Sequence, residues 1–173
     1  MYHLDTPVLP SERLVLRALA PRDWPAIADF LTGPRAAYVG GPVTRERAWR
    51  TFGHLVGHWL LRGYGKFFLT LKGSDQAIGM AGPWFPEGCP GQEVGWPLFS
   101  DAASGKGLAT EAARAELAHA FGRLGRKTAV SSVDPANIRS IRLAERLGAR
   151  LDPSATPPDP TPVYRQSAPG GRA

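Results

Sequence analysis

The chain has 173 residues, of which 43% are hydrophobic and 21% are charged, a composition typical of a globular protein with one hydrophobic core. We therefore expect a single domain over residues 1–173, with its core between 11 and 166. No window approaches the roughly 18 consecutive apolar residues of a membrane span, so the sequence predicts a soluble, cytoplasmic protein without a membrane partner. A single cysteine, Cys89, excludes an internal disulfide and a metal site built on paired cysteines.

The net charge of +6 is concentrated in one part of the chain. Between positions 104 and 150 there are nine basic residues and four acidic ones. Because almost all of the excess positive charge lies in this segment, the sequence predicts a polyanionic partner beside it. Both a nucleic acid and a phosphorylated cofactor have this chemistry.

The first half of the chain predicts a strand, two helices and then an antiparallel meander. Residues 13–19 alternate as a half-buried strand does, and residues 21–31 follow with helical spacing. A second helix is expected to begin after Thr44, a good N-cap, and to end at Gly63. Three later stretches have the pattern of meander strands: 66–72, 76–85 and 92–99.

The second half predicts a different order of elements. A helix from about 107 to 122, a strand over 128–134 and a helix over 136–148 follow one another. Residues 152–162 contain five prolines, so they are expected to form a loop. At most one further strand is expected before a flexible tail over 167–173.

The stretch SGKGLATEAAR, residues 104–114, joins a glycine turn to the start of a helix. It does not match a P-loop, because Gly107 follows Lys106 where a Ser or Thr is needed. It does not match a dinucleotide fingerprint either, because Thr110 stands where the third small residue is required. What remains is a turn that lets the backbone approach a phosphate group at a helix N-terminus. An ordinary glycine-rich helix start stays open as the alternative.

The segments EVGWPLFSDAASGKGLATEAARAELAHAF and VDPANIRSIRLAERLGA resemble the GNAT superfamily of N-acetyltransferases, and within it the RimJ/RimL-like branch. The acetyl-CoA signature of that family, Arg or Gln, two residues, Gly, one residue, then Gly or Ala, maps onto residues 104–109, and Ser104 departs from it. Its second hallmark is an Asn three residues before a Ser, on a helix that ends at Gly. Asn137, Ser140 and Gly148 match this pattern. The resemblance covers roughly residues 11–166. It implies an α+β fold, with a mostly antiparallel central sheet that contains a splayed strand pair and is flanked by helices.

The resemblance also implies acetyl-CoA as cosubstrate and no metal. The strand end would admit the pantetheine arm, the backbone of the glycine turn would hold the pyrophosphate, and Asn137 and Ser140 would reach the cofactor from the other side. Arg139 and Arg142 would meet the 3′-phosphate or form a solvated helix face. The cofactor-binding residues implied in this way are Trp96, Leu98, Phe99, Ser104, Gly105, Lys106, Gly107, Leu108, Ala109, Thr110, Asn137 and Ser140.

The reaction that the resemblance implies is acetyl transfer to a primary amine, of a protein N-terminus or a small molecule, by direct attack in a ternary complex. An alkyl amine is mostly protonated at neutral pH, so a carboxylate base is expected: first Glu93, then Glu87. The backbone N–H groups around Leu98 and Phe99 would polarise the thioester oxygen. The family's tyrosine acid corresponds to Ala144 here, which leaves Tyr38, Ser100 or water as the proton donor.

The acceptor site and the competing functions rest on fewer residues. Tyr38, Trp84 and Phe85 are expected to line the acceptor site, with plain core packing as the alternative. A CoA-binding regulatory or interaction module without catalysis is a second hypothesis, and a basic nucleic-acid-binding protein is a third and weaker one. His54 and His58 are expected to form a helix-surface pair rather than a metal site. A homodimer, formed through the helix surface around Trp49 and Trp59, stays open.

Overall fold

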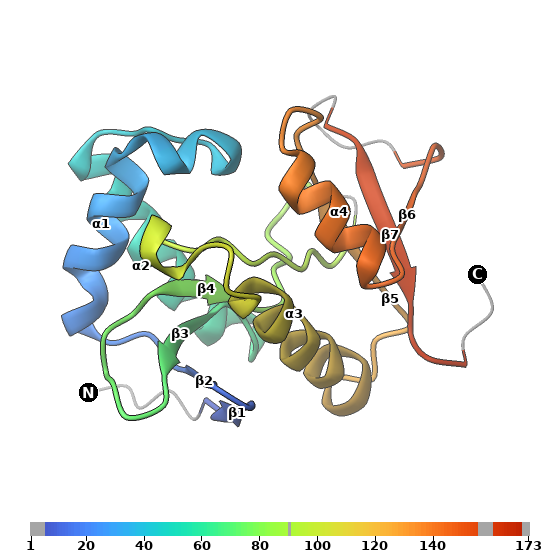
Figure 1. The fold of residues 1–173 in the computed structure, drawn as a ribbon, viewed down its shortest axis with the longest axis horizontal. Helices are drawn as coiled ribbons and strands as arrows, with labels where there is room; N and C mark the ends of the chain where they lie inside the picture. Colours follow the sequence, from blue (N-terminus) through green and yellow to red (C-terminus); the bar gives the residue numbers. More distant parts are fainter. Residues whose placement is uncertain (1–5, 90, 156–160, 171–173) are drawn as a thin grey trace.

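The computed structural model describes residues 6–89, 91–155 and 161–170. Figure 1 shows a layer of strands and helices at the N-terminal side and a second, smaller layer at the C-terminal side. The elements are β1 (Leu9–Pro10), β2 (Leu14–Arg17), η1 (Pro21–Asp23), α1 (Trp24–Thr32), η2 (Pro34–Val39), α2 (Arg45–Arg62), β3 (Phe67–Leu71), β4 (Gly79–Ala81), η3 (Asp101–Ala103), α3 (Leu108–Ala118), η4 (His119–Arg123), β5 (Thr128–Ser132), α4 (Ile138–Arg146), β6 (Arg150–Leu151) and β7 (Val163–Ser167).

The first sheet joins β1, β2, β3 and β4 in that order, and each neighbouring pair is antiparallel. Side chains alternate across this sheet. Leu69 of β3 belongs to the core cluster that contains Leu108 of α3, whereas Phe68 belongs to the cluster that contains Ile27 of α1 and Phe52 of α2. The helices α1 and α2 therefore cover one face of the sheet and α3 covers the other.

The long helix α2 begins and ends where the sequence predicts. The Thr44 side chain accepts a hydrogen bond from the Arg47 N–H at 3.2 Å, which satisfies one of the free donors of the first turn. Gly63 ends the helix at φ 71°, a left-handed conformation that glycine adopts without strain. Both ends are thus fixed by chemistry within the helix itself.

The second sheet has the order β5-β7-β6 and is antiparallel throughout. Leu143 and Ala144 of α4 pack with Ala129 of β5 and with Leu117 of α3, so this layer shares its core with the helix that covers the first sheet. β7 is the single strand that the sequence allows after the proline-rich loop, and it includes Ser167, which we expected in the tail. Positions 156–160 of the predicted loop and 171–173 of the predicted tail lie outside the described residues.

The two sheets meet along residues 92–99, the predicted third meander strand. Val94 donates its N–H to the Val130 carbonyl of β5 at 2.8 Å, and Glu93 forms a parallel bridge with Val130. Further along, Met80 of β4 donates to the Pro97 carbonyl at 3.0 Å and Gly79 bridges to Leu98. The segment therefore leaves β5 after Val94 and continues beside β4. This divergence is the splayed pair, and the α+β fold with flanking helices is confirmed.

The prediction of a regular strand over 92–99, and of one over 76–85, is wrong in detail, because the ladder between them is interrupted. Trp84 and Glu93 exchange two backbone hydrogen bonds, of 2.8 and 2.7 Å. One rung further on, no backbone hydrogen bond joins Gly82 to Gly95 within the described chain. Pro97 cannot donate to the ladder either. Only isolated bridges and the short β4 remain of the two predicted strands.

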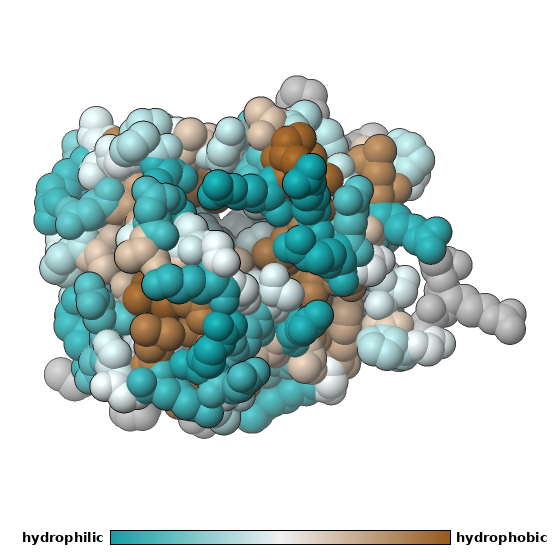
Figure 2. Space-filling view, in the orientation of Figure 1, coloured by the Kyte–Doolittle hydropathy of each residue, from teal (hydrophilic) through white to brown (hydrophobic). Residues whose placement is uncertain are grey.

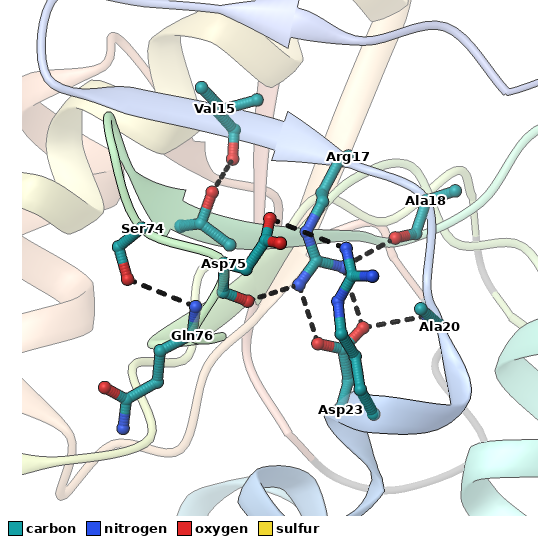
Figure 3. Close-up of polar contacts among 10 residues, drawn as sticks. Val15, Arg17, Ala18, Ala20, Asp23, Ser74, Asp75 and Gln76 are labelled. Atoms are coloured by element: carbon teal, nitrogen blue, oxygen red, sulfur yellow. Dashed lines mark hydrogen bonds and ion pairs between the residues drawn. The ribbon is translucent and has the colours of Figure 1, made fainter.

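A buried ion pair fixes the corner between β2 and α1 (Figure 3). The Arg17 guanidinium donates to both carboxylate oxygens of Asp23, at 2.8 and 2.7 Å, and the Ala20 N–H donates to the same carboxylate at 2.8 Å. The Asp23 side chain is 1% exposed. The pair thus holds the start of the first helix against the first sheet in a site from which water is excluded.

Two predictions about α2 side chains are corrected by their burial. His54 is exposed, but His58 is buried: its Nδ1 donates to the Tyr64 carbonyl at 2.8 Å and its Nε2 accepts from the Phe85 N–H at 3.1 Å. This arrangement requires the neutral ring, and burial lowers the pKa of His58.

Trp59 is also buried and donates to the Lys66 carbonyl at 2.8 Å, so only Trp49 of the two tryptophans is available to a partner.

Candidate active site

A cleft of about 1030 Å³ opens where the two layers diverge. One side is formed by the end of α1 and by η2, the floor by the splayed segment, and the opposite side by the end of β5 and by α4. Figure 2 shows the hollow between the two layers, bordered by hydrophilic side chains. Four arginines and two aspartates are among its lining residues: Arg35, Arg139, Arg142, Arg146, Asp101 and Asp134. The cleft therefore favours an anionic ligand, as the charge distribution of the sequence predicts.

The floor of the cleft presents backbone groups that the sheet does not use. The Pro97 carbonyl and the Phe99 N–H are bonded to β4 and to Ile78, so the Leu98 N–H and carbonyl between them point to the other edge. There the Leu98 carbonyl accepts from Arg35 at 3.3 Å. The Leu98 N–H is thus placed to donate into the cleft. The Phe99 N–H is not, because it already donates to the Ile78 carbonyl at 2.8 Å, and that part of the sequence prediction is wrong.

The glycine turn lies at one end of the cleft and leads directly into α3. Gly105 and Gly107 have φ of 75° and 77°, conformations that other residues rarely adopt. The first turn of α3 has no side-chain cap, and Leu108, Ala109 and Thr110 all line the cleft. The N–H groups of such a turn have no partner within the helix and favour an anion. Lys106 is exposed and does not line the cleft, so its charge acts from the rim.

The glycine turn is held against the first sheet by Glu111. Its carboxylate accepts from the Arg13 N–H at 2.6 Å, from the Arg13 Nε at 2.7 Å and from the Ser11 hydroxyl at 2.7 Å. Burial raises the pKa of Glu111, but these hydrogen bonds and the Arg13 charge outweigh it and lower the pKa to about 2. Arg13 also donates to the Lys106 carbonyl at 2.9 Å. The turn is therefore fixed in shape before any ligand arrives.

The opposite wall carries the second hallmark of the sequence. Asn137 and Ser140 both line the cleft at the start of α4. The Asn137 side chain is the N-cap of that helix, because its Oδ1 accepts from the Ser140 N–H at 3.2 Å. Among the described residues, its amide nitrogen and the Ser140 hydroxyl have no hydrogen-bond partner, so both can make contacts in the cleft.

The acidic and aromatic candidates do not all reach the cleft. Glu93 lies at the point of divergence, outside the lining, and its carboxylate accepts from the hydroxyl of Ser132, which does line the cleft, at 2.6 Å. Glu87 is exposed in a loop away from the lining.

Tyr38 lines the cleft, whereas Trp84 and Phe85 lie outside it, and Trp84 stacks on His58 with ring centroids 4.5 Å apart. The structure therefore brings only Tyr38 of the three aromatic residues to the site.

Two buried ionisable side chains lie behind the floor. Lys66, before β3, and Glu116 of α3 are 7% and 0% exposed. A Cβ atom on Gly95 would lie 3.3 Å from the Lys66 Nζ, so the lysine occupies the space beside the missing rung. Burial raises the pKa of Glu116 to about 8 and lowers the pKa of Lys66. The N–H groups of Gly82 and Gly95 lie near enough to lower the pKa of Glu116, although neither completes a hydrogen bond of good geometry.

Sequence reasoning missed several polar side chains of the cleft, among them Arg35 and Ser132. Neither belongs to a motif, and neither disturbs the periodicity of its element. Arg35 is brought to the site by the packing of η2, and Ser132 by the register of β5 with β7. Ala144, the position of the family's tyrosine acid, is buried in the core. Within the described residues, no group of three His, Cys, Asp or Glu side chains could hold a metal ion, and no helix is long and apolar enough to cross a membrane.

Comparison with known proteins gives consistent matches. The profile of the acetyltransferase (GNAT) domain matches residues 13–150. A crystal structure of an acetyltransferase from Agrobacterium tumefaciens str. C58 superimposes with a TM-score of 0.90 and 38% identity, covering 97% of this chain and 98% of that one. An uncharacterized N-acetyltransferase of Bacillus subtilis (strain 168), YnaD, is 27% identical over 143 residues, which is 82% of each protein.

RimL structures are among those that share this fold. RimL, described as a ribosomal L7/L12 alpha-N-protein acetyltransferase and solved in complex with coenzyme A, shares the fold at a TM-score of 0.74 and 16% identity, over 93% of this chain and 98% of that one. The GNAT family uses acetyl-CoA as its acetyl donor. Because the domain profile covers most of the sequence and the Agrobacterium enzyme matches nearly all of it, the chain belongs to the GNAT acetyltransferase family and is an acyltransferase.

Proposed function

We propose that the protein is an acetyl-CoA-dependent N-acetyltransferase that transfers an acetyl group to a primary amine by direct attack in a ternary complex. The observation that carries this proposal is the form of the cleft. An uncapped helix N-terminus and a glycine turn lie at one end, and the floor carries the Leu98 N–H, which has no backbone partner among the described residues, and the Leu98 carbonyl, which the sheet does not use. A phosphate group and a peptide-like arm need these two surfaces side by side.

The residues present fit acetyl-CoA, which when bound supplies the acetyl thioester. The N–H groups of the first turn of α3 would hold its pyrophosphate, with Gly105 and Gly107 giving the backbone close access. Asn137 and Ser140 would contact it from the wall formed by α4, and Arg139 and Arg142 would meet its 3′-phosphate. The Leu98 N–H would donate to the thioester oxygen and stabilise the charge that develops there.

Glu93 is the proposed base. Its carboxylate bonds to the Ser132 hydroxyl, which lines the cleft, so a proton removed from the amine reaches Glu93 through Ser132 or a water molecule. We expect Glu93→Gln to lower kcat by about 10²–10⁴-fold, the usual contribution of a general base, and to leave the Kd for CoA unchanged. Steady-state kinetics and a CoA titration give both values.

The control for this substitution is Glu145→Gln, a change of the same kind on the exposed side of α4, which should leave kcat unchanged. A larger loss with Glu87→Gln than with Glu93→Gln would assign the base to Glu87. An unaltered pH–rate profile in Glu93→Gln would remove Glu93 from the mechanism.

The function is tested by acetyl transfer to a panel of amines that contains small molecules and peptides with free N-termini. RimL acts on a protein N-terminus by its description, so peptides are the first acceptors to try. We expect thiol release from acetyl-CoA only when an acceptor amine is present, together with an acetylated product detected by mass spectrometry. CoA binding without product across the whole panel would instead favour the non-catalytic CoA-binding module. A homodimer and a cytoplasmic location stay predictions of the sequence.

A further inference from the structure

Arg35 is fixed at the junction between the two sides of the cleft. It belongs to η2, yet its guanidinium bonds to the segment that links the splayed strand to α3. Nη2 donates to Ser104 Oγ at 2.9 Å and to the Leu98 carbonyl at 3.3 Å, and Nη1 pairs with Asp101 Oδ1. One cation therefore touches both the strand end and the first residue of the glycine turn.

The charge of Arg35 is only weakly compensated in this arrangement. The Arg35 side chain is 31% exposed and lines the cleft, whereas the side chain of its partner Asp101 is 88% exposed. An ion pair with a carboxylate that exposed contributes little to stability, because water screens the two charges. A guanidinium has five N–H donors, and the described residues give Nη1 no partner besides Asp101. Arg35 therefore retains the capacity to bind an anion within the cleft.

The position of this cation relative to α3 favours a phosphate ligand. Ser104 lies three residues before Gly107, the N-cap of α3, so the guanidinium and the free N–H groups of the first turn border the same end of the cleft. Ser104 itself carries no charge, and it stands where the acetyl-CoA signature has Arg or Gln. A guanidinium from a different element is therefore present at the place where this chain's own turn lacks one.

We propose that Arg35 binds the pyrophosphate of the cofactor, exchanging Asp101 for phosphate oxygens while it keeps its contacts with Ser104 and Leu98. A forked guanidinium suits phosphate oxygens, and these bonds are stronger than those to a solvated carboxylate. The inference rests on the proposed function, because it takes CoA as the ligand. It adds a binding residue from the wall opposite α4, so that the pyrophosphate would be held from both sides.

The test is a calorimetric titration of CoA into the wild type and its variants at fixed ionic strength. We expect Arg35→Gln to weaken CoA binding by about 10–100-fold, the range for a hydrogen bond to a charged group, and Arg35→Lys to weaken it less because the charge remains. Asp101→Asn removes the competing carboxylate and should leave binding equal or tighter. The midpoint of thermal unfolding, measured for each variant, shows that the fold is retained.

A second variant keeps the inference testable if Arg35 also supports the fold. Ser104→Arg in the Arg35→Gln background returns a guanidinium to within reach of the same site, and we expect it to recover most of the lost affinity. Absence of recovery, combined with a loss of affinity in Asp101→Asn, would show that Arg35 only stabilises the arrangement of the loops it contacts. That result would overturn the proposal. Unchanged CoA affinity in Arg35→Gln with a raised KM for the amine would overturn it too. Failure of the wild type to bind CoA would instead contradict the proposed function.

Discussion

Replacing Lys66 with Met and Glu116 with Leu together should increase the free energy of unfolding by about 1–4 kcal/mol, because the change removes two buried ionisable groups whose desolvation opposes folding. Both side chains are buried, and the two Glu116 oxygens have no hydrogen-bond partner among the described residues. Glu116→Leu alone should instead destabilise the fold by about 3–5 kcal/mol, because it leaves the Lys66 ammonium buried beside an apolar side chain that, unlike glutamine, cannot accept a hydrogen bond from it. Urea unfolding of the single and double variants measures these differences.

The pH dependence of the free energy of unfolding reports the protonation of Glu116. Its pKa rises from an ordinary 4.5 to about 8 in the folded protein, so the folded state keeps a proton that the unfolded state releases. The stability that this group contributes is fully present below pH 4.5 and is lost as the pH rises toward 8. Glu116→Gln keeps the shape without the titration. We therefore expect its unfolding midpoint to rise relative to the wild type between pH 5 and 8, and to match it at pH 4.

The contribution of Glu116 has to be taken from the difference in stability between Glu116→Gln and the wild type, because the pKa of Lys66 is shifted as well. Burial lowers its pKa, and a lysine with a lowered pKa contributes in the opposite direction, since its stabilisation is lost as the pH falls. The same lysine is present in Glu116→Gln and in the wild type, so the difference between them reports the carboxyl group. A double variant less stable than both single variants, or a Glu116→Gln variant less stable than the wild type at pH 8, would contradict this account.

Asp23→Asn should lower the free energy of unfolding by about 3–5 kcal/mol, the usual loss when one partner of a buried ion pair is removed. The substitution removes the charge that faces Arg17, whose side chain is 12% exposed, and it disturbs the hydrogen bond from the Ala20 N–H (Figure 3). Natural domains have a total stability of only about 5–15 kcal/mol, so the loss should be visible as a large fall in the urea midpoint.

The matched control for Asp23 is Asp29→Asn. Asp29 pairs with Arg45 at 3.6 Å, and the two side chains are 78% and 60% exposed. An exposed pair of this kind contributes at most about 1 kcal/mol, so the control should unfold close to the wild-type midpoint. Equal losses in the two variants would show that burial does not determine the strength of the Arg17–Asp23 pair.

The parts of the fold that the sequence predicted well are those fixed by local chemistry. The ends of α2 follow from the Thr44 cap and from Gly63, which lie within the helix or next to it. The glycine turn before α3 and the cap of α4 at Asn137 are local in the same sense. The paired signatures also led to the correct family, because they combine two such local features at a set separation.

The features that the sequence did not reveal depend on contacts between distant segments. His58 has the spacing of a surface residue, and it is buried because the Tyr64 carbonyl and the Phe85 N–H arrive from outside its helix. Residues 92–99 have a strand pattern, but their ladder is broken where Glu116 and Lys66 lie against Gly82 and Gly95. Arg35 reaches the cleft only because η2 packs against the end of the splayed segment.

The measurement that tests the central claim most directly is a calorimetric titration of CoA into the wild type and into Thr110→Asp. Thr110 lines the cleft in the first turn of α3, where a carboxylate stabilises the helix but repels a bound phosphate group. Ala118→Asp, which adds the same charge at the exposed far end of α3, is the control. We predict binding by the wild type and the control, and at least about tenfold weaker binding by Thr110→Asp. Absence of binding by the wild type at millimolar CoA, or equal binding by all three proteins, would contradict the proposal that this cleft holds acetyl-CoA.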